Sequence, residues 1–316
     1  MALITPALGG RTAGDVVRAS LTRRDRDARG LIFLVLLLLA AGITMLVLFT
    51  LLAQIVTEAM PVLENQGTGV VTGTIGSDPA EVGIWPGLFG STFIGLGVVF
   101  VAIPLGVAAA IYLEEYASQG NRLTRLILVN IRNLAGVPAI IYGILGLIIF
   151  VRWLEPVTQG QTVIAAALTM AVLVLPIVII TSMEAIRSVP QGLRDAGYGV
   201  GASRWEVTRD HVLPYAAPGI LTGTVLSIAR ALGEAAPLIV IGAVTGLLPV
   251  TGLTERFTAV PILIFSWSGR PDQPNADISW ANAAASAGLV LLVLVLFFNA
   301  AAIVLRNRFE RRRVGT

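Results

Sequence analysis

The chain has 316 residues, of which 55% are hydrophobic and 13% charged, with a mean hydropathy of +0.83 and a net charge of +3. This composition is outside the soluble globular range and indicates an integral membrane protein. Cysteine and lysine are absent, and there is one histidine. These absences exclude disulfides, thiolate metal sites, Walker A loops, Schiff-base lysines and histidine-based zinc motifs, and they weigh against an enzyme.

The chain begins with a polar, arginine-rich segment, residues 1–30, which we expect to be a disordered cytoplasmic tail. The apolar run from Leu31 to Ala53 is too long for the core of a signal peptide and has the length of a spanning helix. We therefore predict a retained first transmembrane helix over residues 31–57. The segment from Glu58 to Glu81 has no arginine, which is typical of an outer loop.

Residues 84–305 form the predicted core, in which five further apolar runs are each long enough to span a bilayer. An outer loop that ends at Trp280 precedes the last run, and residues 306–316 form a C-terminal tail. The predicted fold class is an all-α integral membrane protein with six transmembrane helices. The five runs are Ile84–Leu113, Leu126–Trp153, Gln161–Ile186, Tyr215–Leu247 and Ala283–Leu305.

Arginines are unevenly distributed between the two sides of these runs. Seventeen lie in the two tails, in the loop after the second run and in the polar insert (residues 187–214) between the fourth and fifth runs. Three, Arg152, Arg256 and Arg270, lie on the other side. Because positive residues are enriched in cytoplasmic loops, we predict that both termini and the polar insert are cytoplasmic.

The polar insert carries signals for two short helices. Ser188 with Gln191 and Ser203 with Glu206 each fit a capping box, in which side chains at both ends satisfy free amides of a first helical turn. Gly201 permits the sharp turn between the two helices.

The first insert helix is expected to carry an apolar stripe with Arg194 and Asp195 pointing elsewhere. Because so short a helix pair cannot bury its own stripe, the stripe is predicted to dock in a groove on this protein or on a partner. The stripe residues are Leu193, Ala196, Gly197 and Val200.

Two opposite charges, Arg230 and Glu234, lie within the fifth run. At about 1.5 Å per residue, Arg230 is roughly 18 Å beyond Pro218, near the middle of a bilayer core about 30 Å thick. Each charge costs about 2.5–3.5 kcal/mol there, so both are expected to face protein or water. Their i, i+4 spacing predicts one helix face, where they form either a structural ion pair or, since arginine matches phosphate oxygens, part of an anion pathway.

Four other charged or titratable residues allow two interpretations. Snorkelling to lipid headgroups is preferred for Arg132, with a place on the anion path as the alternative. Glu114 and Glu115 are expected to form a solvated helix end, with contact to the insert or to an ATPase as the alternative. His211 is expected to be a satisfied interface residue rather than a pH switch.

The insert resembles the EAA motif of ATP-binding-cassette importer permeases, which in that family forms the coupling helix seated in a groove of the ATPase subunit. The chain departs from the usual motif in having Asp195 for glutamate, Gly197 for alanine and His211 for an aliphatic residue. The positions that carry the resemblance, and to which it assigns ATPase coupling, are Asp195, Ala196, Gly197, Gly201, Leu213 and Pro214.

Four further segments resemble the phosphate-specific importer permeases, the last being more similar to the PstA-type than to the PstC-type subunit. The segments are PLGVAAAIYLEEYA (104–117), LAGVPAIIYGILG (134–146), ARALGEAAPL (229–238) and TAVPILIFSW (258–267). The resemblance implies a MetI-like permease of a bacterial inner membrane. Its partners would be a homologous PstC-type permease, a dimer of PstB-type ATPases and an extracytoplasmic PstS-type phosphate-binding protein.

The expected function is a permease subunit of an ATP-driven phosphate importer, which forms half of the pathway. Arg230, Glu234 and Arg132 are the candidate pathway residues. The chain itself is expected to contact lipid and to bind no cofactor, metal or nucleic acid, while ATP and Mg²⁺ are used by the ATPase. The alternatives are a sulfate or molybdate importer, and an intramembrane enzyme with Glu234 as acid or base, which lacks a nucleophile and leaves the insert unexplained.

Overall fold

The computed structural model describes residues 28–118, 120–244, 252–272 and 277–314, and side chains are described within 30–308 of that range. The described residues form helices, with a single isolated β-bridge between Thr162 and Arg256, so the all-α prediction is confirmed. The chain divides into two compact units, Met1–Gln54 and Ile55–Thr316. In the first unit, every large apolar side chain from Leu31 to Leu52 is exposed, as expected for a helix surrounded by lipid.

Among the described residues, five helical stretches are long and apolar enough to cross a membrane, and a sixth is present if one bent helix pair counts as a span. The stretches are Gly30–Gln66, Trp85–Tyr116, Val163–Arg187, Arg204–Gly233 and Trp280–Arg308. They correspond to α2 (Ala28–Gln66), α4 (Trp85–Ile111) with the π-helix η1 (Tyr112–Tyr116), α8 (Val163–Arg187), α10 (Arg204–Val207) with η3 (Thr208–Val212) and α11 (Leu213–Gly233), and α14 (Trp280–Val314).

The third predicted span is not one continuous helix. It consists of α5 (Arg122–Ala135) and then α6 (Ala139–Gly146) with η2 (Leu147–Trp153), which are bent by 103°. Pro138 begins the second part, and proline both lacks an N–H and disfavours helical backbone in the residue before it. The Tyr142 hydroxyl donates a hydrogen bond of 2.8 Å to the Leu134 carbonyl across the break.

The fifth predicted run is also broken. Helix α11 ends at Gly233, Glu234 is extended at φ −91° and ψ 116°, and the short helix α12 covers Ala236–Ile241. Pro237 has no N–H to donate to the carbonyl of Gly233, so an α-helical hydrogen bond cannot continue across this point. The prediction that Arg230 and Glu234 share one helix face is therefore wrong.

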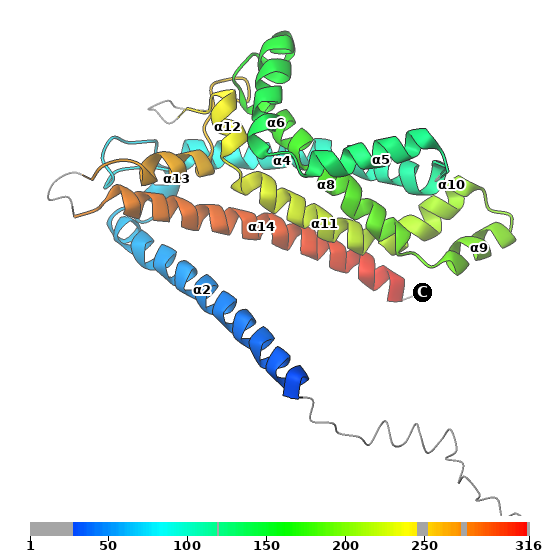
Figure 1. Cartoon of the computed structure of the whole chain (residues 1–316). Helices are drawn as coiled ribbons and strands as arrows, with labels where there is room; N and C mark the ends of the chain where they lie inside the picture. Colours follow the sequence, from blue (N-terminus) through cyan, green and yellow to red (C-terminus); the bar gives the residue numbers. More distant parts are fainter. Residues whose placement is uncertain (1–27, 119, 245–251, 273–276, 315–316) are drawn as a thin grey trace, which may run out of the picture. The chain divides into compact units, whose positions relative to one another are not determined.

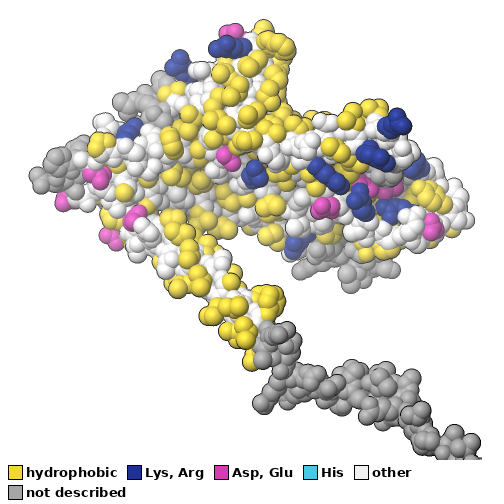
Figure 2. Space-filling model, in the orientation of Figure 1, with side chains coloured by type: hydrophobic (Ala, Val, Ile, Leu, Met, Phe, Trp, Pro, Cys, Tyr) yellow, Lys and Arg dark blue, Asp and Glu magenta, His cyan; other side chains and the backbone are white. Residues whose placement is uncertain are grey.

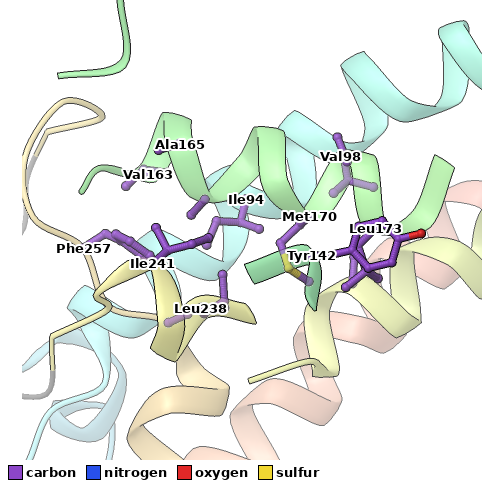
Figure 3. Packing of buried hydrophobic residues seen from close by; sticks show 14 of the residues in the cluster. Ile94, Val98, Tyr142, Val163, Ala165, Met170, Leu173, Leu238, Ile241 and Phe257 are labelled. Carbon is purple, nitrogen blue, oxygen red and sulfur yellow. The ribbon is translucent and has the colours of Figure 1, made fainter. Parts of the chain in front are cut away.

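The core of the second unit lies where α8 packs against α4, α6 and α11 (Figure 1). Figure 3 shows Ile94 and Val98 of α4 facing Met170 and Leu173 of α8, beside the Tyr142 ring. The two broken stretches meet in this core, because α6 packs on α12 at Gly143, where a Cβ would lie 2.8 Å from Pro237 Cα.

The predicted outer loop before Trp280 contains a buried helix, α13 (Val260–Ser268), packed against α14. Its Trp267 is fully buried, and the Val260 amide donates a 2.9 Å hydrogen bond to Ser91 Oγ of α4. This segment is thus part of the packed unit rather than a free loop. The remaining short helices of the described chain are α3 (Gly69–Thr72), α7 (Glu155–Thr158) and α9 (Gln191–Gly199).

Candidate functional site

The polar insert folds into two short helices, α9 and α10, as predicted. The capping box of Ser203 and Glu206 is present. The one proposed for Ser188 is wrong, because its hydroxyl donates to the Ala185 carbonyl at 2.8 Å, within the last turn of α8. Pro190 precedes the first residue of α9 instead, so this helix begins from the fixed backbone of a proline and without a side-chain cap.

Two glycines shape the insert for different reasons. Gly201 has φ +86°, the left-handed conformation predicted for the turn, and a Cβ added there would meet no atom within 4 Å. Its requirement for glycine therefore lies in the backbone alone. At Gly197 a Cβ would lie 2.8 Å from Val207 Cγ2, so this glycine lets α9 approach α10 closely.

The buried face of α9 differs from the predicted stripe. Leu193 is half-buried and Gly197 buried, but Ala196 is exposed and Val200 is 84% exposed. Arg194, which was expected to point elsewhere, turns inward and leaves 12% of its side chain exposed. The face of α9 that carries Arg194 is turned inward, toward the buried carboxylate of Glu115.

Arg194 ties α9 to the ends of two long helices. Its Nη2 and Nε donate to Oε1 of Glu115 over 2.8 and 3.2 Å. Its other hydrogen bonds reach the carbonyl oxygens of Ile186 at 2.9 Å and Val189 at 2.7 Å, at the end of α8, where carbonyls lack helical partners. Only 6% of the Glu115 side chain is exposed, and charge-assisted hydrogen bonds are stronger than neutral ones.

The neighbours of Glu115 make two parallel contacts. Glu114 forms a salt bridge with Arg187 at the end of α8. The guanidinium of Arg204, in α10, lies 5.1 Å from the centre of the Tyr116 ring, within cation–π range. Three consecutive residues of η1 thus each hold one arginine, and we call these six residues the η1 bracket.

The prediction of a solvated end at Glu114 and Glu115 is wrong, and the alternative contact with the insert is present. Sequence patterns missed it because the two members of each ion pair are 73 and 79 residues apart in the chain. The signal available in the sequence was an acidic pair at a span end, together with arginines in the insert.

The other predicted coupling residues lie around this packed face. Asp195 and Ala196 are exposed on α9, and Pro214 is exposed in the first turn of α11. Leu213 is half-buried and packs against the hydrophobic cluster that includes Val189 and Val207. His211 is exposed, and its Cδ2 lies 3.4 Å from where a Cβ on Gly197 would be.

Arg230 lies in the last turn of α11 and is exposed, while Glu234 is half-buried in the break. The described structure contains no ion pair between them. A cation in the last helical turn is favoured by the helix dipole. An intramembrane arginine that is exposed on an isolated chain needs water or another protein chain beside it.

Arg132, on α5, is exposed and lines a cavity. The cavity, of about 140 Å³, is lined by Arg132 together with Glu184 and Arg187 of α8 and apolar residues. Neither Arg230 nor Glu234 lines it, and the place of Arg132 on an anion pathway stays a prediction.

Residues 102–315 match the family described as binding-protein-dependent transport system inner membrane component. The phosphate transport system permease protein PstA 1 of Mycobacterium tuberculosis (strain CDC 1551 / Oshkosh) is 34% identical over 232 residues, 73% of each chain. The probable ABC transporter permease protein YqgI of Bacillus subtilis (strain 168) is 33% identical over 279 residues, which cover 84% of this chain and 90% of the relative.

A chain of a bacterial alginate ABC transporter, solved with an alginate pentasaccharide-bound periplasmic protein, has the same fold. The TM-score is 0.61 at 16% identity, over 97% of this chain and 99% of that one. The fold, the length of the match and the identity to PstA proteins agree. The chain therefore belongs to the binding-protein-dependent transport system inner membrane component family, as an ABC transporter permease of the PstA type.

Proposed function

We propose that this chain is the permease subunit of an ATP-driven phosphate importer and forms half of its translocation pathway. The observation that carries the proposal is the identity of 34% over 232 residues to a phosphate transport permease. The exposed arginine in the last turn of α11 supports it, since an arginine at membrane depth is compatible with a path for an anion.

Arg230 and Glu234 are the proposed pathway residues. Arg230 lies in the last turn before a break in the helix, and Glu234 lies in the break. Irregular backbone at membrane depth is tolerated where it is buried in protein or lines a water-filled cavity. Arg230 offers charge to the passing anion. Glu234 can accept a hydrogen bond from an anion that still carries a proton, which phosphate has near neutral pH and sulfate lacks.

The insert is proposed to dock on an ATPase subunit. Beyond the packed face of α9, the apolar side chains of Tyr198, Val200 and Trp205 are 42%, 84% and 52% exposed, which suits a protein partner. Asp195 and Ala196 border this surface. Within the η1 bracket, the pair of Arg194 and Glu115 would pass movement of the docked insert to the ends of α4 and α8, because a buried hydrogen-bonded ion pair resists separation.

The complete transporter would contain a PstC-type permease, two PstB-type ATPase subunits that use ATP and Mg²⁺, and a PstS-type binding protein on the outer side. The insert and both termini would then face the cytoplasm. In this arrangement, closure of the ATPase dimer brings the coupling helices together and the spans alternate between inward-open and outward-open states.

Uptake of labelled phosphate tests the proposal in cells that lack their own phosphate importers and express this chain with its neighbouring ATPase, permease and binding protein. We expect ATP-dependent phosphate uptake that excess sulfate or molybdate leaves unchanged. Uptake of sulfate instead of phosphate would favour the oxyanion alternative. Absence of any ATPase from the purified complex would remove the transport assignment.

A further inference from the structure

Arginines from four elements line one cavity beside the insert. The cavity has a volume of about 710 Å³, and its charged lining consists of Arg132, Arg187, Arg194 and Arg204 with Glu114 and Glu115. Figure 2 shows arginine side chains gathered at the end of the second unit that carries α5 and the insert. Four positive charges therefore face two negative ones.

The two carboxylates are already occupied. Glu115 accepts both of its hydrogen bonds from Arg194, and Glu114 pairs with Arg187, which stays 56% exposed. Arg132 has no hydrogen-bond or ion-pair partner within the described residues, and Arg204 stacks on an aromatic ring. The cavity thus keeps an excess of two positive charges with guanidinium donors still free to bind an anion.

A smaller cavity adjoins the first and has a different lining. It measures about 140 Å³ and shares Leu128, Arg132 and Arg187 with the arginine-lined cavity. The rest of its lining consists of the apolar residues Ile131, Ile180 and Met183 and the acidic residue Glu184. A single ligand with an anionic group for the arginine-lined cavity and an apolar chain for the smaller cavity would fit the two cavities together.

The position of the two cavities indicates the source of such a ligand. They lie where the apolar spans α4 and α8 end in charged residues, the level at which a bilayer has its headgroups. Helix α5 beside them exposes Leu123, Leu126 and Ile127 by 61%, 59% and 38%. An amphipathic helix with exposed leucines and arginines is suited to the membrane interface, and basic pockets between spans bind anionic headgroups.

We propose that the two cavities together bind one anionic membrane phospholipid, with its phosphate among Arg132, Arg187 and Arg204 and the start of an acyl chain against Leu128, Ile131 and Ile180. The lipid bridges α5 and the helix ends that hold the insert. The assignment concerns the membrane interface and does not rest on the transported substrate.

The test uses the full-length chain, purified with its partner subunits, and native mass spectrometry with phosphatidylglycerol or phosphatidylcholine. We expect retention of phosphatidylglycerol in preference to phosphatidylcholine, about fivefold weaker in Arg132→Gln and in Arg204→Gln, as for the loss of one basic residue at a membrane surface. Arg132→Lys should retain most of the binding. Arg125→Gln is the matched control, since it neutralises an exposed arginine of α5 that lines neither cavity.

Equal retention of phosphatidylglycerol by the wild type and by both glutamine variants would overturn the proposal, as would equal loss in Arg125→Gln. A parallel arm measures binding of inorganic phosphate to the delipidated complex. Binding of phosphate that requires Arg132, without preferential retention of phosphatidylglycerol, would overturn the lipid assignment in favour of a free anion. Phosphate uptake is measured in a separate assay, so a failure of the transport assignment is distinguishable from a failure of the lipid assignment.

Discussion

Arg194 in the insert donates two hydrogen bonds to Glu115 at the end of the second span, and both side chains are nearly buried. The same guanidinium holds two carbonyls at the end of α8. One side chain therefore joins the proposed coupling helix to two of the long helices of the bundle.

The first prediction concerns this pair. Arg194→Gln leaves Glu115 buried and unpaired, and breaking a buried ion pair costs about 3–5 kcal/mol, so the yield of folded protein should fall. The double variant Glu115→Gln with Arg194→Gln removes both charges and should restore folding. We expect this double variant to retain ATP hydrolysis in the complex but to lose most phosphate uptake.

The matched control for this pair is Arg209→Gln with Asp210→Asn, which removes an exposed salt bridge from the same insert. Exposed pairs contribute about 0–1 kcal/mol, so this variant should behave as the wild type. Wild-type uptake by the folded double variant at Glu115 and Arg194 would show that the ion pair has only a structural role.

The second prediction concerns the turn of the insert. Gly201→Val places a β-branched residue at φ +86°, where left-handed backbone costs an L-residue about 1–2 kcal/mol or more. The protein should reach the membrane, lose its hold on the ATPase and lose uptake. Gly199→Val is the control. An added Cβ meets no atom within 4 Å at Gly199 or at Gly201, but only Gly201 of the two has a positive φ. Co-purification of normal amounts of ATPase with Gly201→Val would contradict the prediction.

The third prediction concerns the proposed pathway. Because the described structure contains no ion pair between Arg230 and Glu234, Arg230→Gln should leave the folded yield unchanged. Loss of one charged hydrogen bond to the anion corresponds to about 1.5–3 kcal/mol, so uptake should fall roughly 10- to 100-fold. Arg152→Gln, at an exposed arginine of η2, serves as the control.

A different result would reveal a structural pair. If Arg230→Gln lowers the folded yield, and Arg230→Gln with Glu234→Gln restores both yield and uptake, the two residues stabilise the assembled transporter rather than bind the anion.

The fourth prediction concerns orientation, and the natural absence of cysteine makes it simple to measure. Single cysteines at Glu64 and Asp195, both exposed, should react with an impermeant reagent from opposite sides of the membrane. The asymmetry of arginines places Glu64 outside and Asp195 inside. Labelling of Asp195→Cys from outside intact cells would overturn the predicted topology and the coupling role together.

The sequence alone determined the features that depend on local composition. Apolar runs of spanning length identified the long helices, since the bilayer has a fixed thickness. The capping box at Ser203 and the left-handed Gly201 were predictable because each depends on the conformation of a few adjacent residues. Each motif segment is contiguous in the chain, so the sequence alone was also sufficient to identify the permease family.

Tertiary structure decided the features that depend on residues distant in the chain. The bend between α5 and α6 and the break at Glu234 follow from prolines already visible in the sequence, but prolines also occur inside α4 and α8 without ending them. Packing selects which proline breaks a helix. The sequence predicts a solvated position for Glu115 because its partner, Arg194, is 79 residues away in the chain. A buried charge becomes favourable only when folding brings a counter-charge to it, and local patterns do not contain that information.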